Sequence, residues 1–242
     1  MMCNQKGLSR RSVLKKMGAA TVATVGLGIT GFPKSGKAKS AAESRSTYKV
    51  YSPGKIGSMR LKNRFIKAAT ATESTNAEGK FLPRGLEIYR KWSLGGVGLI
   101  ETGAMSVVPF EYQSMKHNLY QIWDDKHIPY LKELTKTVHG ADPHCKIIAL
   151  LNHKGNHPVL AQGHTISASA QPWPGQKKKP RALNLSGIQE VENAFVNAAV
   201  RAKKAGVDGV ILQGAHQFFL HSFLSPQTNK RRDEYGGSLE NR

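Results

Sequence analysis

The chain has 242 residues, of which 39% are hydrophobic and 21% are charged. This is enough for one domain with a sizeable core, and the mixture excludes a disordered chain. The net charge of +20 invites a nucleic-acid-binding interpretation, but +8 of it lies in residues 1–42. No basic stripe with interleaved aromatic residues follows, so we expect no nucleic-acid partner. A charge-driven polyanion-binding protein stays the alternative from a different class.

Residues 1–42 are predicted to be an export signal. Adjacent Arg10 and Arg11 precede an uncharged, glycine-containing stretch at 17–32 and a small-residue region at 38–42. The pattern resembles the twin-arginine signal, which implies the twin-arginine export machinery as a partner and a periplasmic location after cleavage. The stretch is too short and too rich in glycine for a stable membrane span. The alternative is a disordered basic tail.

The two cysteines are divided between the leader and the mature part. Cys3 lies in the leader, so Cys145 is alone in residues 43–242 and no intrachain disulfide is possible there. We therefore expect packing and a bound ligand to supply the stability.

Residues 43–242 alternate short apolar runs with amphipathic ones. In chain order the pattern predicts a strand at 63–70, a helix at 83–94, a strand at 97–102, a helix at 127–139, a strand at 146–151 and a loop at about 153–185. A further helix begins with a capping box of Ser186 and Gln189, and Gly206 ends it. A fourth strand follows at 209–213.

This alternation indicates βα units and a parallel sheet. A doubly wound sheet would often carry a glycine-rich phosphate loop after its first strand, but residues 68–72 contain no such glycines. The α/β fold class that we predict is therefore a (β/α)8 TIM barrel, with about strands 1–4 present in this chain and the active site on the loops that follow the strands.

A long motif near the C-terminus resembles the old yellow enzyme family. Its matching residues are Gly214-Ala215-His216, Phe223-Leu224-Ser225-Pro226, Asn229, Arg232-Asp233, Tyr235-Gly236-Gly237-Ser238 and Glu240-Asn241-Arg242. Segments at 56–58, 61–64, 95–100, 152–155 and 205–210 match in the same order. The resemblance therefore covers essentially all of residues 50–242.

The resemblance implies a barrel that holds FMN at its strand ends. NAD(P)H would reduce the flavin, whose N5 then passes hydride to an activated alkene or another small-molecule acceptor. The residues carried over as cofactor contacts are Ala68, Ala69, Thr70, Gly103 and Ala104. Thr70 would bond the flavin O4/N5 edge, and Gly103 would let the backbone approach the ring. The alternative for Thr70 is a hydroxyl bonded to its own loop.

The substrate site carried over from the family consists of His216 and Gln213. His216 would donate a hydrogen bond to the substrate carbonyl oxygen and stabilise the enolate-like charge, although a lone histidine is also common as a structural residue. The set Asn229, Arg232, Asp233 and Tyr235 is expected to be structural, pinning a folded loop. We expect no metal site, since no cluster of metal-ligating residues is visible.

Four residues depart from the family pattern. Gln213 stands in place of a histidine, Phe218 in place of the tyrosine that protonates the substrate, Leu150 in place of a flavin-binding glutamine and Asn156 in place of an arginine. Phenylalanine has no transferable proton, so reduction of an alkene would need solvent or another acid.

The chain ends where the fourth helix should begin, at Arg242. Strands 5–8 and the loops that would hold the FMN phosphate are not in it. We expect the chain by itself to be poorly stable and free of flavin, because its outer strands would expose unpaired edges. It would then be a fragment of an FMN enzyme or a truncated, non-catalytic remnant. A self-paired half-barrel is a further alternative.

Overall fold

The computed structural model describes residues 48–109, 120–157, 165–173, 175 and 177–242, all within the unit Ala41–Arg242. The predicted export signal, residues 1–42, lies outside the described residues.

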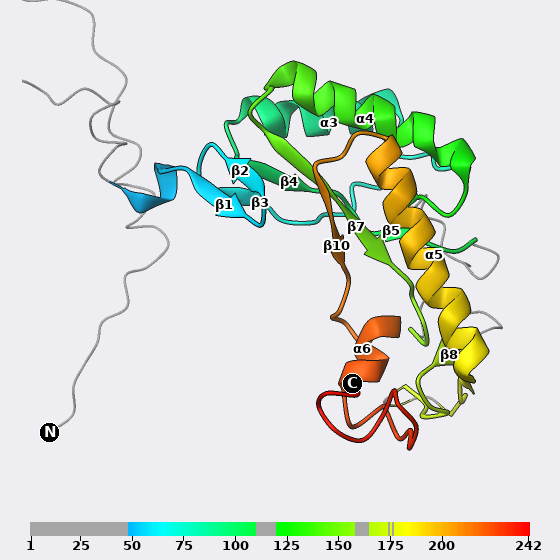
Figure 1. Ribbon diagram of the computed structural model, residues 1–242. Coiled ribbons are helices and arrows are strands. Elements are labelled where there is room, and N and C mark those ends of the chain that lie inside the picture. Colours follow the sequence, from blue (N-terminus) through cyan, green and yellow to red (C-terminus); the bar gives the residue numbers. More distant parts are fainter. Residues whose placement is uncertain (1–47, 110–119, 158–164, 174, 176) are drawn as a thin grey trace, which may run out of the picture. The chain divides into compact units, whose positions relative to one another are not determined.

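Parallel strands form the centre of this unit (Figure 1). The four that follow one another along the chain are β3 (Ile66–Lys67), β4 (Leu99–Glu101), β7 (Lys146–Asn152) and β10 (Gly209–Leu212). Each pairs in parallel with the next, with Leu99 opposite Lys146 and Gly209 opposite Ile148. The short strands β5 (Met105–Ser106) and β6 (Tyr120–Gln121) continue the sheet beside the end of β7. The predicted parallel arrangement is confirmed.

Three helices connect the strands and lie on one side of the sheet (Figure 1). They are α3 (Pro83–Leu94), α4 (Ile128–Ala141) and α5 (Leu185–Lys204). The bounds of α3 agree with the prediction, because Pro83 has its fixed φ at the first helical position, where no backbone donor is lost.

The second helix differs slightly from the prediction of 127–139. A short 3₁₀ helix, η2 (Asp125–His127), precedes α4, and Asp124 accepts a hydrogen bond from the Lys126 amide at its start. Gly140 lies within α4 and does not end it. The helix stops at Ala141 because Asp142 precedes Pro143, and the residue before a proline is disfavoured in the helical region.

The N-cap of α5 was placed wrongly from the sequence. Asn184, two residues before the expected Ser186, caps the helix, and its Oδ1 accepts a hydrogen bond of 2.9 Å from the Gly187 amide. The Ser186 hydroxyl donates to the same Oδ1 at 3.1 Å. Asparagine is as good an N-cap as serine, and the tertiary position of the chain decided between them. Gly206, with φ of +87°, follows the helix end as expected.

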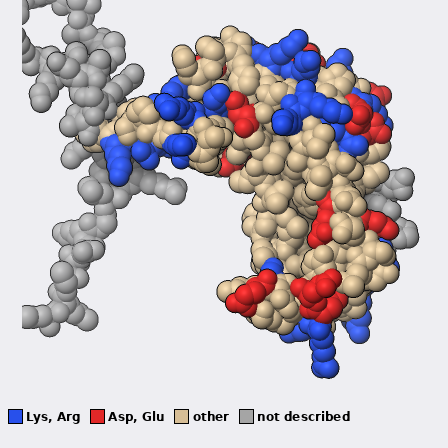
Figure 2. All heavy atoms as spheres, in the orientation of Figure 1, with Lys and Arg blue, Asp and Glu red and all other residues tan. Residues whose placement is uncertain are grey.

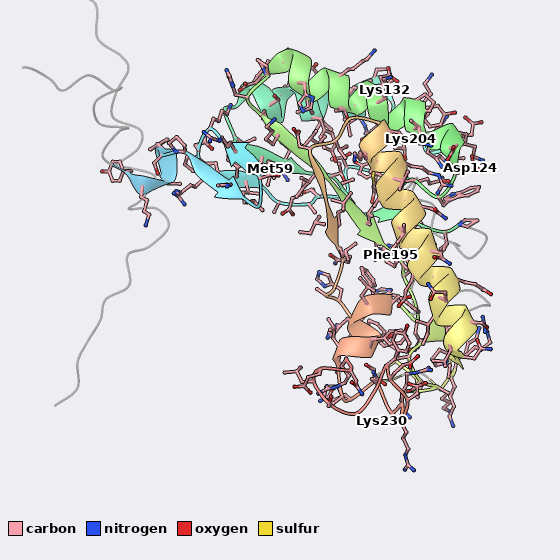
Figure 3. The ribbon with its side chains drawn as sticks, in the orientation of Figure 1. Met59, Asp124, Lys132, Phe195, Lys204 and Lys230 are labelled. Atoms are coloured by element: carbon pink, nitrogen blue, oxygen red, sulfur yellow. The ribbon has the colours of Figure 1, made fainter. Side chains whose placement is uncertain are left out.

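The strands bury apolar side chains on both faces, as parallel strands do. On β7, Ile147, Ala149 and Leu151 belong to the large cluster that the helices cover, which also contains Phe195 of α5 (Figure 3). Ile148 faces the other way and packs with Leu61 and Leu99 in a second, smaller cluster. The two clusters explain why this strand reads as one continuous apolar run.

An antiparallel hairpin contributes to the smaller cluster. It consists of β1 (Gly54–Ile56) and β2 (Met59–Leu61), joined through Gly57 at φ of +57°. Met59 and Leu61 pack against Leu99 and Ile148 from this hairpin (Figure 3). An ion pair between Lys62 and Asp142 ties the end of the hairpin to the segment that leads into β7.

Two regions differ from the prediction: one has less regular structure than expected, and the other has more. The strand expected at 63–70 is regular only at Ile66–Lys67, and the loop expected at 153–185 contains the parallel pair β8 (Ile166–Ser167) and β9 (Arg181–Ala182). A 3₁₀ helix, η1 (Lys49–Tyr51), precedes the hairpin, and α6 (Phe219–Leu224) follows β10.

Charged side chains are unevenly distributed on the face that Figure 2 shows. Lys and Arg gather over α4, with acidic residues among them, and the surface over β10 is uncharged. Leu212 of β10 is 54% exposed and Ile66 of β3 is 46% exposed, so both outer strands present apolar side chains to solvent. No helix in the described part of the chain is long and apolar enough to cross a membrane.

Candidate active site

The carboxyl ends of β3, β4, β7 and β10 lie at the same edge of the sheet, because the strands are adjacent and parallel. The segments that follow them carry the predicted site residues. Hydrogen bonds join these segments: the Gln213 amide donates to Leu151 O at 3.0 Å, and the Leu150 amide donates to the side-chain Oγ1 of Thr102 at 3.0 Å. The fold therefore brings the four segments to one rim.

The segment after β3 is held by polar contacts of its own. The Ala69 amide donates to Glu101 Oε2 on β4 at 3.1 Å. The Thr70 hydroxyl accepts from Lys67 Nζ at 2.6 Å and donates to Ala68 O at 3.2 Å. These are the local bonds that we gave as the alternative to a flavin contact. A flavin edge would have to compete with the Lys67 ammonium, which also lies 4.2 Å from the centre of the Trp92 ring.

The segment after β4 is tightly enclosed. Gly103 is buried, and its amide donates to the Tyr89 hydroxyl at 3.0 Å. A Cβ placed on Gly103 would lie 2.2 Å from Tyr120 Cε2 and 3.0 Å from Thr70 O. Packing against Tyr120 is therefore sufficient to require glycine here, in addition to the predicted approach of a cofactor. Ala104 is partly exposed beside it.

The end of β7 carries an unpaired carboxamide. Asn152 is 1% exposed, and neither its Nδ2 nor its Oδ1 has a hydrogen-bond partner among the described residues. Because side chains alternate along a strand, Asn152 lies on the same face as Leu150, the position at which the sequence resemblance leads us to expect a flavin-binding glutamine. Buried amide groups are nearly always paired, so this donor and acceptor are suited to a ligand. Sequence reasoning missed Asn152; its signal was a polar residue at the end of an apolar strand.

The end of β10 is conformationally strained. His216 and Gln217 both have left-handed backbone conformations, with φ of +56° and +54°. Each such non-glycine residue costs about 1–3 kcal/mol, and strain of this kind is concentrated at functional sites. The Gln217 amide donates to His221 Nδ1 at 2.7 Å, which supports the turn. His216 is exposed, and Gln213, the first residue after β10, is partly buried.

Aromatic and basic side chains surround Phe218 at this rim. The centre of its ring lies 5.9 Å from that of His216 and 5.2 Å from that of His157. The Nζ atom of Lys154 lies 5.2 Å from the same ring centre, within the range of a cation–π contact. His157 also packs against Trp173 at 4.8 Å. Lys154 and His157 were not among the predicted site residues, although both follow directly after β7.

Burial lowers the pKa of three basic groups at this rim. It lowers the pKa of His153 to about 4 and that of Lys154 to about 8. The pKa of His157 is lowered first by burial and then by the positive charges of Lys154 and His216. His153 and His157 are therefore neutral at pH 7, whereas Lys154 is mostly protonated.

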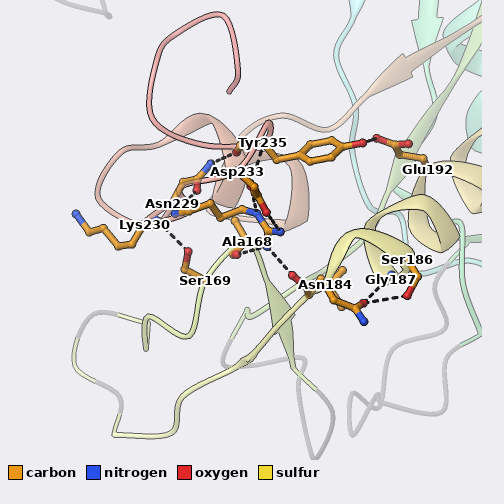
Figure 4. Close-up of polar contacts among 12 residues, drawn as sticks. Ala168, Ser169, Asn184, Ser186, Gly187, Glu192, Asn229, Lys230, Asp233 and Tyr235 are labelled. Atoms are coloured by element: carbon orange, nitrogen blue, oxygen red, sulfur yellow. Dashed lines mark hydrogen bonds and ion pairs between the residues drawn. The ribbon is translucent and has the colours of Figure 1, made fainter.

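The loop after α6 is pinned by polar side chains (Figure 4). Asn229 Nδ2 donates to Phe223 O at 2.8 Å and to Tyr235 O at 2.7 Å, and its Oδ1 accepts from the Arg231 amide at 3.0 Å. Tyr235 reaches Glu192 on α5 with its hydroxyl at 3.2 Å.

The guanidinium in this network belongs to Arg231, not to the expected Arg232. It donates to the carbonyl oxygens of Ala168 and Leu183 and pairs with Asp233. These contacts are made within the protein, which agrees with the predicted structural role of the loop. Among the described residues, no group of three or more His, Cys, Asp or Glu side chains is placed to hold a metal ion.

Parallel strands that alternate with helices, and whose carboxyl ends share a rim of polar side chains, form a partial parallel half-barrel that is consistent with an incomplete (β/α)8 barrel. Residues 49–242 match the NADH:flavin oxidoreductase / NADH oxidase family, and the chain belongs to this family. The family resemblance seen in the sequence is thereby confirmed.

The similar proteins are longer than this chain. An NADH oxidase of Thermoanaerobacter brockii is 35% identical over 198 residues, which are 80% of this chain and 30% of that protein. An NADPH dehydrogenase of Clostridium acetobutylicum is 37% identical over 196 residues, 80% of this chain and 56% of that protein. The structure of morphinone reductase in complex with tetrahydroNAD is similar with a TM-score of 0.69 and 27% identity, covering 80% of this chain and 57% of that one.

Proposed function

We propose that this chain forms the amino-terminal half of the barrel of an FMN-dependent oxidoreductase that takes hydride from NAD(P)H and reduces a small-molecule acceptor, such as an activated alkene. The observation that carries the proposal is the common rim of the four strand ends, with Thr70 after β3 and the pair Gln213 and His216 after β10. The family membership of residues 49–242 supports the flavin chemistry.

The residues at the rim fit a flavin ring. Ala68, Ala69 and Gly103 are small, and Asn152 offers an unpaired donor and acceptor on the strand where the family's glutamine is missing. FMN bound there would accept hydride from NAD(P)H and deliver it from N5. Thr70 would hold the O4/N5 edge once its hydroxyl turned from Ala68 O. The Asn152 carboxamide matches a pyrimidine edge, which also has both donor and acceptor atoms.

The acceptor would be held by the end of β10. His216 and Gln213 would donate hydrogen bonds to its carbonyl oxygen and stabilise the negative charge that develops there on hydride transfer. Gln213 stands where the family has a histidine, and its neutral amide would donate a weaker hydrogen bond than an imidazolium at that position. Loss of one donor of this kind typically slows turnover by about 10²–10³-fold.

A flavin titration tests this function. The chain by itself is expected to be free of flavin, so the test uses a complete barrel protein that has this chain as its amino-terminal half. Its apo-form is titrated with FMN, and the loaded protein is mixed with NADH or NADPH without oxygen while the visible flavin absorbance is followed. Stoichiometric binding and bleaching are expected. Thr70→Ala should weaken binding or lower the flavin potential, whereas the control Thr137→Ala should change neither, because the Thr137 hydroxyl donates to Glu133 O within α4.

A second candidate function is a non-catalytic remnant. Phe218 and Leu150 favour it, because they replace side chains that the family uses for proton transfer and flavin binding. Absence of FMN binding by the protein at millimolar flavin would support the remnant and refute the oxidoreductase.

We propose in addition that residues 1–42 direct export to the periplasm by the twin-arginine route. The adjacent Arg10 and Arg11 before a weakly apolar stretch support this. Fusing residues 1–42 to a reporter that folds in the cytoplasm tests it. Export should be lost when both arginines are replaced by lysine, and export that survives this change would exclude the route.

A further inference from the structure

The proposed reduction of an alkene needs a proton donor near the acceptor, and Phe218 does not provide one. Phe218 occupies the position expected for a donor tyrosine, but its side chain has no exchangeable proton. The group that replaces the tyrosine must lie beside this ring, since the ring marks where the tyrosine hydroxyl would be. Among the described residues, Lys154, His157 and His216 contact the Phe218 ring. Lys154 and His157 carry exchangeable protons, and His216 is the residue proposed to hold the acceptor.

Lys154 is placed to act there. Its Nζ lies 5.2 Å from the centre of the Phe218 ring, and the His216 ring lies 5.9 Å from the same centre. Lys154 and His216 therefore both border the Phe218 ring, and an acceptor bound by His216 over this ring would be within the neighbourhood of both. The side chain of Lys154 is partly buried, and no carboxylate partner for its ammonium is found among the described residues. Its charge is thus not engaged in a structural ion pair.

The other charged and titratable groups at this rim do not neutralise Lys154. His157 faces it from the same loop, His216 from the segment after β10, and His153 precedes it in the chain, stacked on Phe219 at 4.9 Å. None of these groups is acidic. Burial lowers the pKa of Lys154 from 10.5 to about 8, which leaves it mostly protonated at pH 7 and makes it a stronger acid than an exposed lysine.

We propose that Lys154 is a catalytic residue, the general acid that protonates the α-carbon of an α,β-unsaturated acceptor in place of the tyrosine that Phe218 replaces. This inference rests on the proposed function. Once hydride has reached the β-carbon, an electron pair is shared between the α-carbon and the carbonyl oxygen held by His216. That pair forms the new C–H bond at the α-carbon, the N–H bond of Lys154 breaks, and its electrons remain on the nitrogen as a neutral amine. Water then returns a proton to the amine.

Half-reaction kinetics of the flavin-loaded protein separate this proposal from the proposed function. Reduction by NAD(P)H does not need the acid, so Lys154→Met should leave its rate unchanged. Reoxidation by an α,β-unsaturated ketone should slow by about 10²–10⁴-fold, the usual contribution of a general acid. The wild-type reoxidation rate should fall as the pH rises through about 8, and the variant should lose this limb.

Two further variants keep the test decisive. The double variant Lys154→Met/Phe218→Tyr restores a donor hydroxyl at the ring and should recover reoxidation, which a merely structural lysine would not allow. Lys132→Met is the matched control, because Lys132 is exposed on α4 away from the rim (Figure 3), and it should change neither half-reaction. Reoxidation at the wild-type rate in Lys154→Met would overturn the proposal; a comparable loss in His157→Leu alone would assign the acid to His157 instead.

A titration without turnover provides the second readout. Lysines of the protein are labelled with ¹³C-methyl groups and followed by NMR between about pH 6 and pH 12, which spans the titration of both ordinary and shifted lysines. One resonance, absent in Lys154→Met, should titrate near pH 8 while the others titrate near their ordinary value. A Lys154 signal that titrates with the exposed lysines would refute the proposal. Failure to bind FMN would instead refute the proposed function.

Discussion

Replacing Gly103 with alanine separates two reasons for a glycine at the end of β4. The added Cβ would lie 2.2 Å from Tyr120 Cε2 and 2.8 Å from Cδ2, far inside ordinary van der Waals contact. The Tyr120 ring has little freedom to move, because it is 3% exposed and packs on Phe81 with ring centres 4.9 Å apart. Overpacking of a core costs about 1–3 kcal/mol, and we expect the upper half of this range.

The measurement is equilibrium unfolding in urea, followed by tryptophan fluorescence. Gly140→Ala is the control, because a Cβ on Gly140 in α4 meets nothing within 4 Å and should stabilise by about 0.5–1 kcal/mol. In a double-mutant cycle with Tyr120→Leu, the cost of Gly103→Ala should fall by at least about 1 kcal/mol. Unchanged stability in Gly103→Ala together with weaker FMN binding would show that the glycine serves the cofactor and not Tyr120.

Other predictions concern the capping of α5, the C-terminal loop and the acid side of the stability profile. Asn184→Ala should lower the free energy of unfolding in urea by about 1 kcal/mol, because Asn184 accepts a hydrogen bond from the helix backbone. Ser186→Ala should lower it by much less, and equal losses would show that Ser186 also caps the helix. Asn229→Ala should cost about 1–3 kcal/mol, because two partly buried carbonyls and one amide lose their partner; the exposed Asn193→Ala should cost almost nothing, and a similar loss in both would refute the pinning role. For Asp208, burial raises the pKa, but hydrogen bonds from Lys146, the Ile147 amide and His139 outweigh it and lower the pKa below 3.8. Its stabilising contribution is therefore full above that value and is lost as the pH falls through the lowered pKa, so Asp208→Asn should flatten the stability profile between roughly pH 5 and pH 2; an unchanged slope would contradict this.

The periodicity of the sequence correctly predicted those helices and strands whose ends are set by residues nearby in the chain. Helix α3 was correct at both ends because Pro83 and the Gly95-Gly96 pair act within one turn of the chain. The apolar run at 146–151 predicted the strand that the structure has as β7 (Lys146–Asn152). The order β3-β4-β7-β10 also followed from the sequence, since short connections with helices restrict consecutive parallel strands to neighbouring places.

The errors came from choices that local sequence leaves open. Asn184 and Ser186 are both good N-caps, and only the packing of α5 on the sheet selected the first. Arg231 and Arg232 are chemically identical neighbours, yet only Arg231 has the carbonyl oxygens of Ala168 and Leu183 within reach. Such choices depend on groups that are distant in the chain.

For the candidate site, the sequence by itself predicted residue types at strand ends: His216 lies within a family motif, and Thr70, Gly103 and Gln213 were carried over from their positions relative to the predicted strands. Only the tertiary structure placed Lys154 beside Phe218 and left the carboxamide of Asn152 buried without a partner. The physical reason is that a side chain's acidity and bonding depend on the solvent and charge around it. That environment is assembled from β7, the loop after it and the turn after β10, which meet only when the sheet has formed.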